Sequence, residues 1–345
     1  MSLSDSKLSR RRLLGGAAAA GATLPVLHEL VPHGPLHGTG TASAAEEMAR
    51  DVRSHRAADH LGAMGKVDSN VNGFDPQEIL RDFDEGRLVG GVREWDVVAE
   101  EKEIEVAPGV KYLAWMYNGR IPGPTFRARE GERLRIRFTN GSQHPHTIHF
   151  HGIHRAAMDG VPGLGAGNIQ PGRSTVYEFD ATPFGLHLYH CHSTPLAEHI
   201  AKGLYGAFVI DPKDGRPPAD ELVMVMNGFD TNFDRANEVY AVNTVAFEYL
   251  HRPVQVKRGE LVRIYLVNLL EFDFVNSFHV HANFFDYYPT GTRLEPRDFT
   301  DTVVLGQGER GILELRFPYT GKYMFHAHVS EFAELGWMGF FEVSE

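Results

Sequence analysis

The sequence predicts an all-β protein of two tandem β-sandwich domains, and three observations carry that prediction. Short segments alternate apolar and polar residues, as in "RLRIRF" (133–138), where Leu134, Ile136 and Phe138 share one face. Turns rich in glycine and proline, such as "NGRIPGP" (118–124), separate these segments, and no long helical period occurs. The chain also repeats itself, so each half is expected to form one sandwich.

The repeat sets the expected domain boundaries. A polar, proline-rich stretch, "DPKDGRPPADE" (211–221), falls between the two copies, as a linker would. We therefore expect a first domain over residues 91–212, a linker over 213–222 and a second domain over 223–345. Three pairs of segments match at an offset of roughly 130 residues: "REGERLRIRFTN" (129–140) with "KRGELVRIYLVN" (257–268), "GLHLYHCH" (185–192) with "GKYMFHAH" (321–328), and "GLYGAFVI" (203–210) with "GWMGFFEV" (336–343).

Composition limits the classes of function. The 345 residues are 42% hydrophobic and 23% charged, which is enough apolar material for two cores. A net charge of −11 argues against a nucleic-acid-binding protein, which would need a basic face. The chain has 19 histidines and a single cysteine. Since one cysteine cannot form an intrachain disulfide, Cys191 is a core thiol, an intermolecular bridge or a metal ligand.

The first 44 residues resemble a twin-arginine export signal. Three arginines (10–12) precede a short apolar run, and "TASA" ends at Ala44 with the small residues of a cleavage site. The apolar run (13–27) is too short for a membrane span, which needs about 20 apolar residues. We therefore expect export to the periplasm or the extracellular space, and no membrane-spanning segment elsewhere.

An acidic arm over residues 45–90 is expected between the signal and the first domain. Within it, "FDPQEILRDFDEG" predicts one short helix, with Asp75 as N-cap, Pro76 at the first position and Gly86 near its end. We assign no chemistry to this arm and expect it to pack on the body of the protein or on a neighbouring subunit.

Four histidine motifs carry the chemistry. Alternate residues of a strand point to the same face at a rise of about 3.3 Å per residue, so a His-x-His pair aims two imidazoles one way. Two motifs stand at equivalent places in each half, which indicates ligands of a metal cluster and argues against scattered structural histidines. The motifs are "HTIHFHG" (146–152), "HCH" (190–192), "HVH" (279–281) and "HAH" (326–328).

Cys191 stands between two of these histidines. By alternation it points away from both neighbours and belongs to a second site on the opposite face. A thiolate with two imidazoles is the ligand set of blue-copper sites, and His146 and His199 are available to complete it. Five residues after His199, where an axial methionine often stands, the chain has Leu204. Leucine cannot coordinate, which favours a three-coordinate copper with a raised reduction potential.

On these motifs, residues 90–345 resemble the multicopper oxidases, and more narrowly their laccase-like, two-domain bacterial members. The resemblance implies two cupredoxin-like Greek-key β-sandwiches and four copper ions per chain: one type 1, one type 2 and two type 3. It assigns the type 1 copper to His146, Cys191 and His199, with Leu204 at the axial position. It assigns the type 2 copper to His149 and His279, and the type 3 coppers to His151, His190, His192, His281, His326 and His328.

Two further residue assignments follow from the resemblance and from the repeat. Asp159, in "MDGVPG", matches an acid that supplies protons at the trinuclear site, although an ordinary turn aspartate before Gly160 is the structural alternative. The repeat predicts that the only type 1 site lies in the first domain. In the second domain, the counterparts of its three ligands are Asn276, Ala327 and Phe332.

The resemblance also implies an assembly and a reaction. Each domain supplies four of the eight cluster histidines, which implies a homotrimer in which the first domain of one subunit faces the second domain of the next. The sequence leaves pairing within one chain open. The expected reaction is one-electron oxidation of a phenol, aromatic amine, metal ion or nitrogen oxide, coupled to four-electron reduction of O2 to water.

Two other functions remain as alternatives. A copper-containing nitrite reductase shares the two sandwiches, the trimer and the type 1 copper. In that family an aspartate typically stands where this chain has His149, and the positions of His192 and His326 are not histidine. A copper carrier or electron-transfer module would need only the ligands around Cys191, and it would leave eight histidines without a role.

Overall fold

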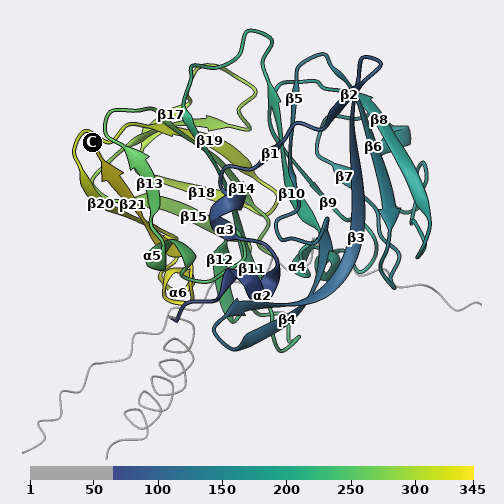
Figure 1. Cartoon of the computed structure of the whole chain (residues 1–345), viewed down its shortest axis with the longest axis horizontal. Coiled ribbons are helices and arrows are strands. Elements are labelled where there is room, and N and C mark those ends of the chain that lie inside the picture. The colour runs from purple at the N-terminus through teal and green to yellow at the C-terminus, as the bar shows by residue number, and fades with distance from the viewer. Residues whose placement is uncertain (1–64) are drawn as a thin grey trace, which may run out of the picture. The chain divides into compact units, whose positions relative to one another are not determined.

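The computed structural model describes residues 65–345 (Figure 1). The expected export signal (1–44) and the start of the expected arm (45–64) lie outside the described residues. Within residues 65–345, no helix is long and apolar enough to cross a membrane. The α-helices of this region are short: α2 (Ser69–Asn72), α3 (Pro76–Ile79), α4 (Leu196–Ala201), α5 (Glu248–His251) and α6 (Ser330–Glu334).

The first half is a sandwich of two sheets. One has the strand order β1-β5-β10-β9-β7, and the other has the order β2-β3-β6-β8, with β4 also paired to β3. Alternating aromatic and aliphatic side chains from both sheets form one core between them. The strands are β1 (Phe83–Asp84), β2 (Arg87–Val89), β3 (Val92–Ala107), β4 (Val110–Tyr117), β5 (Thr125–Arg129), β6 (Arg133–Asn140), β7 (His149–Phe150), β8 (Ser174–Asp180), β9 (Gly185–His190) and β10 (Tyr205–Asp211).

The second half repeats this design. Its sheets have the orders β12-β11-β14-β19-β16-β17 and β13-β21-β20-β15-β18, again with one core between them. The strands are β11 (Asp220–Phe229), β12 (Val239–Val242), β13 (Val254–Lys257), β14 (Val262–Asn268), β15 (Val275–Val280), β16 (Phe285–Pro289), β17 (Asp298–Thr300), β18 (Thr302–Gly306), β19 (Arg310–Leu315), β20 (Gly321–His326) and β21 (Met338–Ser344).

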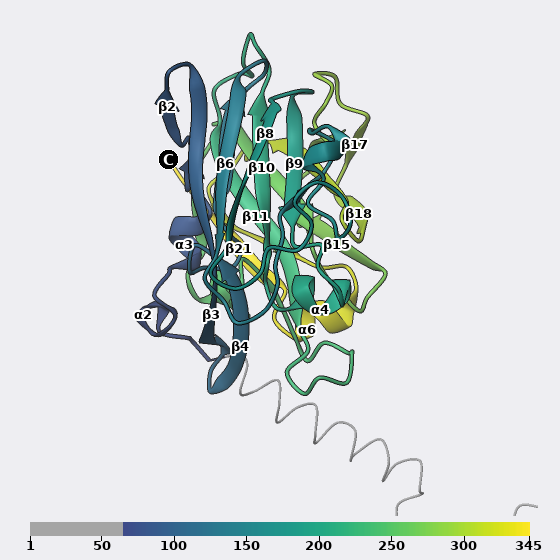
Figure 2. The ribbon, with the colours of Figure 1, turned by 90° about the vertical axis from the view of Figure 1, so that its right-hand side faces the viewer.

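Matching sequence segments become matching strands. The central strand β6 pairs in parallel with β3 and antiparallel with β8, and β14 pairs in the same way with β11 and β19. Turned by 90°, Figure 2 shows the strands of both halves running along a common direction. The predicted all-β fold of two cupredoxin-like sandwiches is thereby confirmed.

The helix expected after Asp75 is shorter than the sequence indicated. It begins as predicted, because the Asp75 side chain accepts a hydrogen bond from the backbone N–H of Gln77 and Pro76 follows at the first position. It ends at Ile79 and does not continue toward Gly86. Pairing with the sheet competes successfully with the helix there, because the segment after it forms β1 and lies parallel to β5.

The two halves are joined by an apolar contact and by a network of ion pairs. A hydrophobic cluster combines buried residues of both halves. Beside it, Arg127 of β5 binds Asp211 at 2.7 Å and Glu221 of β11 at 2.6 Å. Arg263 of β14, only 2% exposed, binds Glu221 at 2.9 Å and Glu314 at 2.6 Å. Each buried charge in this network therefore has a partner.

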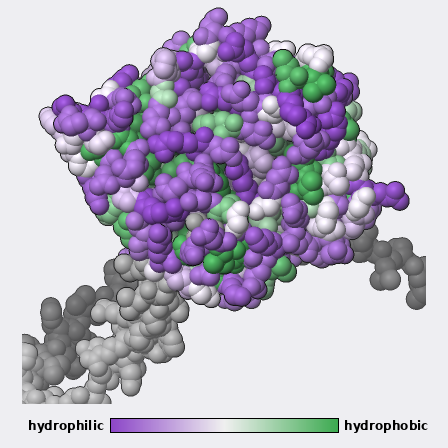
Figure 3. Space-filling model, in the orientation of Figure 1, coloured by the Kyte–Doolittle hydropathy of each residue, from purple (hydrophilic) through white to green (hydrophobic). Residues whose placement is uncertain are grey.

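The face drawn in Figure 3 is mainly hydrophilic, with hydrophobic residues in small separate patches. Most large apolar side chains of the described residues lie in the cores instead. This distribution agrees with two sandwiches that bury apolar side chains inside each half and in the contact between them.

Arg263→Leu is expected to lower the free energy of unfolding by up to about 3–5 kcal/mol near pH 7, because it leaves two partly buried carboxylates, those of Glu221 and Glu314, without that cation. Burial acts to raise the pKa of Glu221, yet its bonds to Arg127, Tyr265 and Arg263 lower it below the usual 4.5. In the native protein, the contribution of ionised Glu221 to the free energy of unfolding is present above pH 4.5 and is lost as the pH falls below it.

In the variant, the pKa of Glu221 rises because this carboxyl loses Arg263, so the difference in the free energy of unfolding from the native protein should shrink as the medium is acidified. Denaturant titrations at several pH values measure this. Arg133→Leu, which removes two surface ion pairs, to Glu178 and to Asp180, is the control and should cost no more than about 1 kcal/mol per pair. A deficit that grows on acidification would contradict this account.

Candidate metal centre

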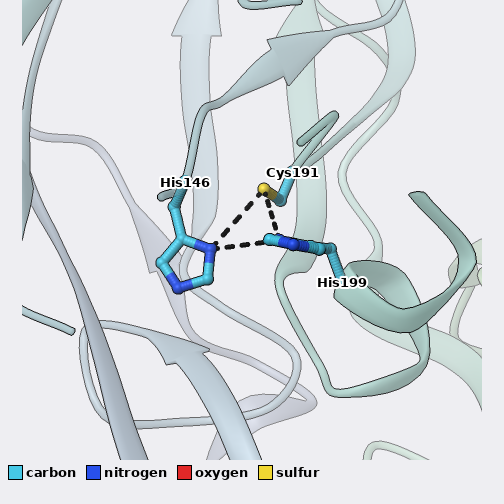
Figure 4. Close-up of side chains that lie close together, drawn as sticks. All are labelled: His146, Cys191 and His199. Atoms are coloured by element: carbon cyan, nitrogen blue, oxygen red, sulfur yellow. Dashed lines mark hydrogen bonds between the residues drawn. The ribbon is translucent and has the colours of Figure 1, made fainter. Parts of the chain in front are cut away.

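Three buried side chains converge at the end of β9. The Sγ of Cys191 lies 3.2 Å from Nδ1 of His199 and 3.8 Å from Nδ1 of His146, and the two Nδ1 atoms are 3.1 Å apart (Figure 4). Cys191 and His146 are fully buried, and His199 is 3% exposed. We call these residues the Cys191 trio.

Separate segments bring the trio together. His146 lies just before β7, where its backbone N–H and C=O both bind Ile169. His199 lies on α4. Leu204, fully buried, donates its N–H to the carbonyl of His199 at 3.3 Å and accepts the N–H of Cys191 at 2.9 Å. The backbone of Leu204 therefore ties two members of the trio to each other.

Burial sets the protonation of the trio. It lowers the pKa of His146 to about 3 and that of His199 to about 4, so both imidazoles are neutral and keep a free lone pair. Burial also raises the pKa of the Cys191 thiol, while the N–H of Thr147, 3.4 Å from Sγ, favours the thiolate. One sulfur and two neutral imidazole nitrogens within 4.8 Å of one another fit a copper ion.

The first half also holds four histidines on the other side of Cys191. His149 and His190 lie directly opposite each other in the β7–β9 ladder. Nε2 of His190 lies 2.9 Å from Nε2 of His151, and the His192 ring lies 5.3 Å from that of His149. Burial lowers the pKa of His151 to about 3 and of His190 to about 4, which leaves them neutral. We call these four histidines the first quartet.

The second half builds the same arrangement. His279 and His326 lie opposite each other in the β15–β20 ladder, and Nε2 of His281 lies 3.0 Å from Nε2 of His326. The His328 ring lies 5.3 Å from that of His279. We call these four the second quartet. Unlike its counterpart in the first half, His281 is exposed to solvent.

Backbone carbonyl oxygens orient two histidines of each quartet. In every case the contact is made by Nδ1, so the backbone leaves Nε2 available for a metal ion, and Nε2 of His190 and of His326 faces another histidine of the same quartet. The Nδ1–oxygen distances are 2.8 Å for His149 to Asp159, 2.8 Å for His190 to Cys191, 2.9 Å for His279 to Asp301 and 2.7 Å for His326 to Ala327.

The two quartets do not meet within the chain. Among residues 65–345, no group of three or more potential metal ligands combines histidines of both quartets. Every assigned histidine lies with its expected neighbours from the same half.

Asp159 lies against the first quartet, together with a histidine that sequence reasoning did not select. Its Oδ1 is 2.9 Å from Nδ1 of His149 and 3.4 Å from Nε2 of His154. His154 lies outside the four histidine motifs, and its spacing along the chain does not reveal the contact. The short 3-10 helix at 156–158 turns the chain and brings His154 and Asp159 together.

The second half has no trio. Ala327, where the first half has Cys191, is fully buried, and the ring of Phe332 is stacked on Tyr240 with centroids 4.1 Å apart. The counterpart of His146 is the buried Asn276. Hydrophobic side chains thus occupy most of the place that corresponds to the trio, and the ligand replacements are those that the repeat indicated.

A cavity of about 310 Å³ is lined in part by residues of α4, including Glu198, the neighbour of His199. Its walls come from both halves and combine aromatic with charged side chains. They include Tyr112, Glu198, Lys202, Asp230, Phe233 and Phe272.

Comparison with known proteins agrees with this arrangement in both halves. Two sequence families, each described as multicopper oxidase, match residues 98–215 and 216–345. A solved structure of a multicopper oxidase is 64% identical, with a TM-score of 0.80, and the match covers 81% of this chain and 100% of that one.

Nitrite reductases are also similar to this chain. The copper-containing nitrite reductase of Neisseria gonorrhoeae is 32% identical over an alignment of 252 residues, and the match covers 66% of this chain and 62% of that protein. The match thus spans less than two thirds of that relative. The copper nitrite reductase structure from Nitrosomonas europaea is 28% identical, with a TM-score of 0.66, over 74% of this chain and 94% of that one. Since both halves match its sequence families, the chain belongs to the multicopper oxidase family.

Proposed function

We propose that this oxidoreductase is a laccase-like oxidase. It would oxidise a small reductant, such as a phenol, aromatic amine, metal ion or nitrogen oxide, by single electrons and reduce O2 to water. The observation that carries the proposal is the pair of matching quartets, because two sets of four converging histidines exceed what a single catalytic copper needs. Bound copper, four ions per chain, would supply the one-electron chemistry at the trio and the reduction of oxygen at the quartets.

The protein's own groups divide this work. His146, Cys191 and His199 would hold the type 1 copper, with the buried Leu204 offering no axial ligand. His149 and His279 would hold the type 2 copper, and the other six quartet histidines the two type 3 coppers. The covalent bonds from Cys191 to its two neighbouring histidines join the sites. Asp159, with Oδ1 at 2.9 Å from His149, is placed to hold a proton beside the first quartet.

We infer that a cluster forms between subunits of a homotrimer. The quartets stay apart within the chain, and His281 of the second quartet faces solvent. Exposed apolar side chains lie nearby: Phe284 is three residues along the chain from His281 and stacks on Phe299, which is 69% exposed. Exposed apolar surface next to an incomplete metal site favours a second copy of the chain as the covering partner.

Nitrite reduction is the second candidate, favoured by the 32% identity to the Neisseria gonorrhoeae enzyme. That reaction requires one catalytic copper besides the type 1 site. His149, His192 and His326 all lie in quartets here, which supports the three-copper arrangement instead. For cellular location, we propose the twin-arginine route to the periplasm or the extracellular space.

Copper loading separates the two functions. Protein loaded anaerobically and then exposed to air should bind about four copper ions per chain, one blue and two silent in spin resonance, because eight cluster histidines suit three ions. Oxygen uptake with a phenol as donor should follow. About two copper ions, both visible by spin resonance, would instead place nitrite reduction first.

Mixing two inactive variants tests the shared cluster. His151→Ala disables the first quartet and His281→Ala the second, so each homotrimer should be inactive. Subunits mixed equally and reassembled should recover about a quarter of native oxygen uptake, because one interface in four joins two intact quartets. Mixing each variant only with itself is the control. No recovery in proven mixed trimers would show that the cluster forms within one chain.

Leu204→Met tests the missing axial ligand. The thioether should reach the copper of the trio and lower its reduction potential by more than ~59 mV, a tenfold change in a one-electron equilibrium. Redox titration of the blue absorption measures this. Leu204→Ile, which adds no donor atom, is the matched control and should leave the potential close to native. An equal shift in both variants would assign the effect to packing.

A further inference from the structure

No ligand of the Cys191 trio is accessible to a reductant in solution. His146 and Cys191 are fully buried, and His199 is 3% exposed. The ring that covers both histidines belongs to Trp115 of β4. Its centroid lies 5.1 Å from that of His146 and 4.8 Å from that of His199, in edge-to-face contact with each. An electron from outside must therefore cross another group before it reaches a ligand.

A second ring connects Trp115 to the surface. The His144 ring lies against the indole with centroids 4.7 Å apart and planes inclined by 35°. The His144 side chain is 52% exposed, whereas Trp115 is only 5% exposed. Two ring contacts thus lead from solvent to both imidazoles of the trio. Since electron tunnelling weakens steeply with each gap, a continuous stack of rings is a favourable path.

We propose that Trp115 is the electron-transfer bridge between external reductants and the Cys191 trio, with His144 as the outer contact. A donor would lose one electron, a copper ion held by the trio would gain it, and Trp115 would be the same before and after the transfer. The inference rests on the proposed function only in that the trio must bind copper.

The surroundings of the indole favour a bridge over a tryptophan radical. Its Nε1 is buried and has no hydrogen-bond partner, so no base is placed to take the N–H proton. The ammonium of Lys202 lies 5.6 Å from the ring centroid, and a positive charge there disfavours a radical cation. Electrons would therefore pass through the ring without residing on it.

Packing alone is the competing explanation, and the repeat supplies a control for it. Trp115 donates its backbone N–H to the carbonyl of Lys202 at 2.9 Å, and Tyr240 does the same to Leu335 at 3.1 Å in the second half. Tyr240 stacks on Phe332, which replaces His199. An aromatic ring therefore packs this position in both halves, but only Trp115 lies against a metal site.

The cavity lined in part by α4 offers a rival path. Glu198, one of its lining residues, is covalently joined to His199, so a donor bound there could bypass Trp115. Phe233 is 64% exposed and lines the same cavity, so Phe233→Ala alters this path and leaves the rings at the trio in place.

The test is the anaerobic reduction of copper-loaded, full-length protein by ferrocyanide, followed as loss of the blue absorption in a stopped-flow instrument. Trp115→Leu should slow this step by at least about tenfold, with copper content, blue spectrum and reduction potential unchanged. Trp115→Phe should slow it less, and His144→Ala should also slow it. Reoxidation of the reduced protein by O2 should keep its native rate, and rapidly frozen samples should show no tryptophan radical.

Tyr240→Leu is the matched control, since it removes the equivalent ring from the second half and should leave the reduction rate unchanged. Phe233→Ala should also reduce at the native rate. The proposal is overturned if Trp115→Leu is reduced at the native rate, or if a shifted potential explains all of the slowing. It is equally overturned if Phe233→Ala alone slows the step.

If Trp115→Leu does not fold, Trp115→Phe and His144→Ala test the proposal instead. Reduction by ferrocyanide at the native rate in both variants would reject the bridge. Failure of the proposed function would look different. Protein that takes up no oxygen but whose blue absorption is lost more slowly in the Trp115 variants would reject the oxidase and retain the bridge.

Discussion

The alternation of side chains along one short stretch of backbone organises the whole metal centre. At the end of β9, Cys191 points toward His146 and His199. Its neighbours His190 and His192 point the other way, toward His151 and His149 of the first quartet. Two chemically different sites are thereby joined through bonds of adjacent residues. A register slip of one residue would exchange the two faces and destroy both sites together, so the pairing of β9 with β7 and β10 sets the function as well as the fold.

The second half shows what this backbone arrangement does without a thiol. Its quartet repeats the strand register, the convergent Nε2 atoms and the carbonyl contacts of the first. At the place of the trio it has Ala327 and a Phe332–Tyr240 stack, which bury apolar surface where the first half buries metal ligands. One fold can thus keep half of a cluster and replace the neighbouring site by packing. This separation agrees with a single point of electron uptake per chain.

The degree of burial differs between the trio and the second quartet. Around the trio it is nearly complete, which keeps the imidazoles neutral and leaves Trp115 and His144 between the ligands and water. In the second quartet the exposed His281 leaves the half-cluster open. The family relationship identifies an oxidoreductase that uses copper. Because the trio is buried, the proposed donor path runs through the first half. Because His281 is exposed, the proposed subunit contact involves the second half.

Much of this protein was determined by the sequence alone: the strand alternation, the repeat, the four His-x-His motifs and the loss of trio ligands in the second half. These features depend on period and spacing, which are local properties of an extended chain. The tertiary structure alone decided that α3 stops at Ile79, that His154 joins Asp159, and that Trp115 covers the trio. It also decided that the quartets stay apart within one chain. Each of these depends on contacts between segments distant in sequence or on the competition between helix formation and sheet pairing. Residue spacing along the chain does not reveal either.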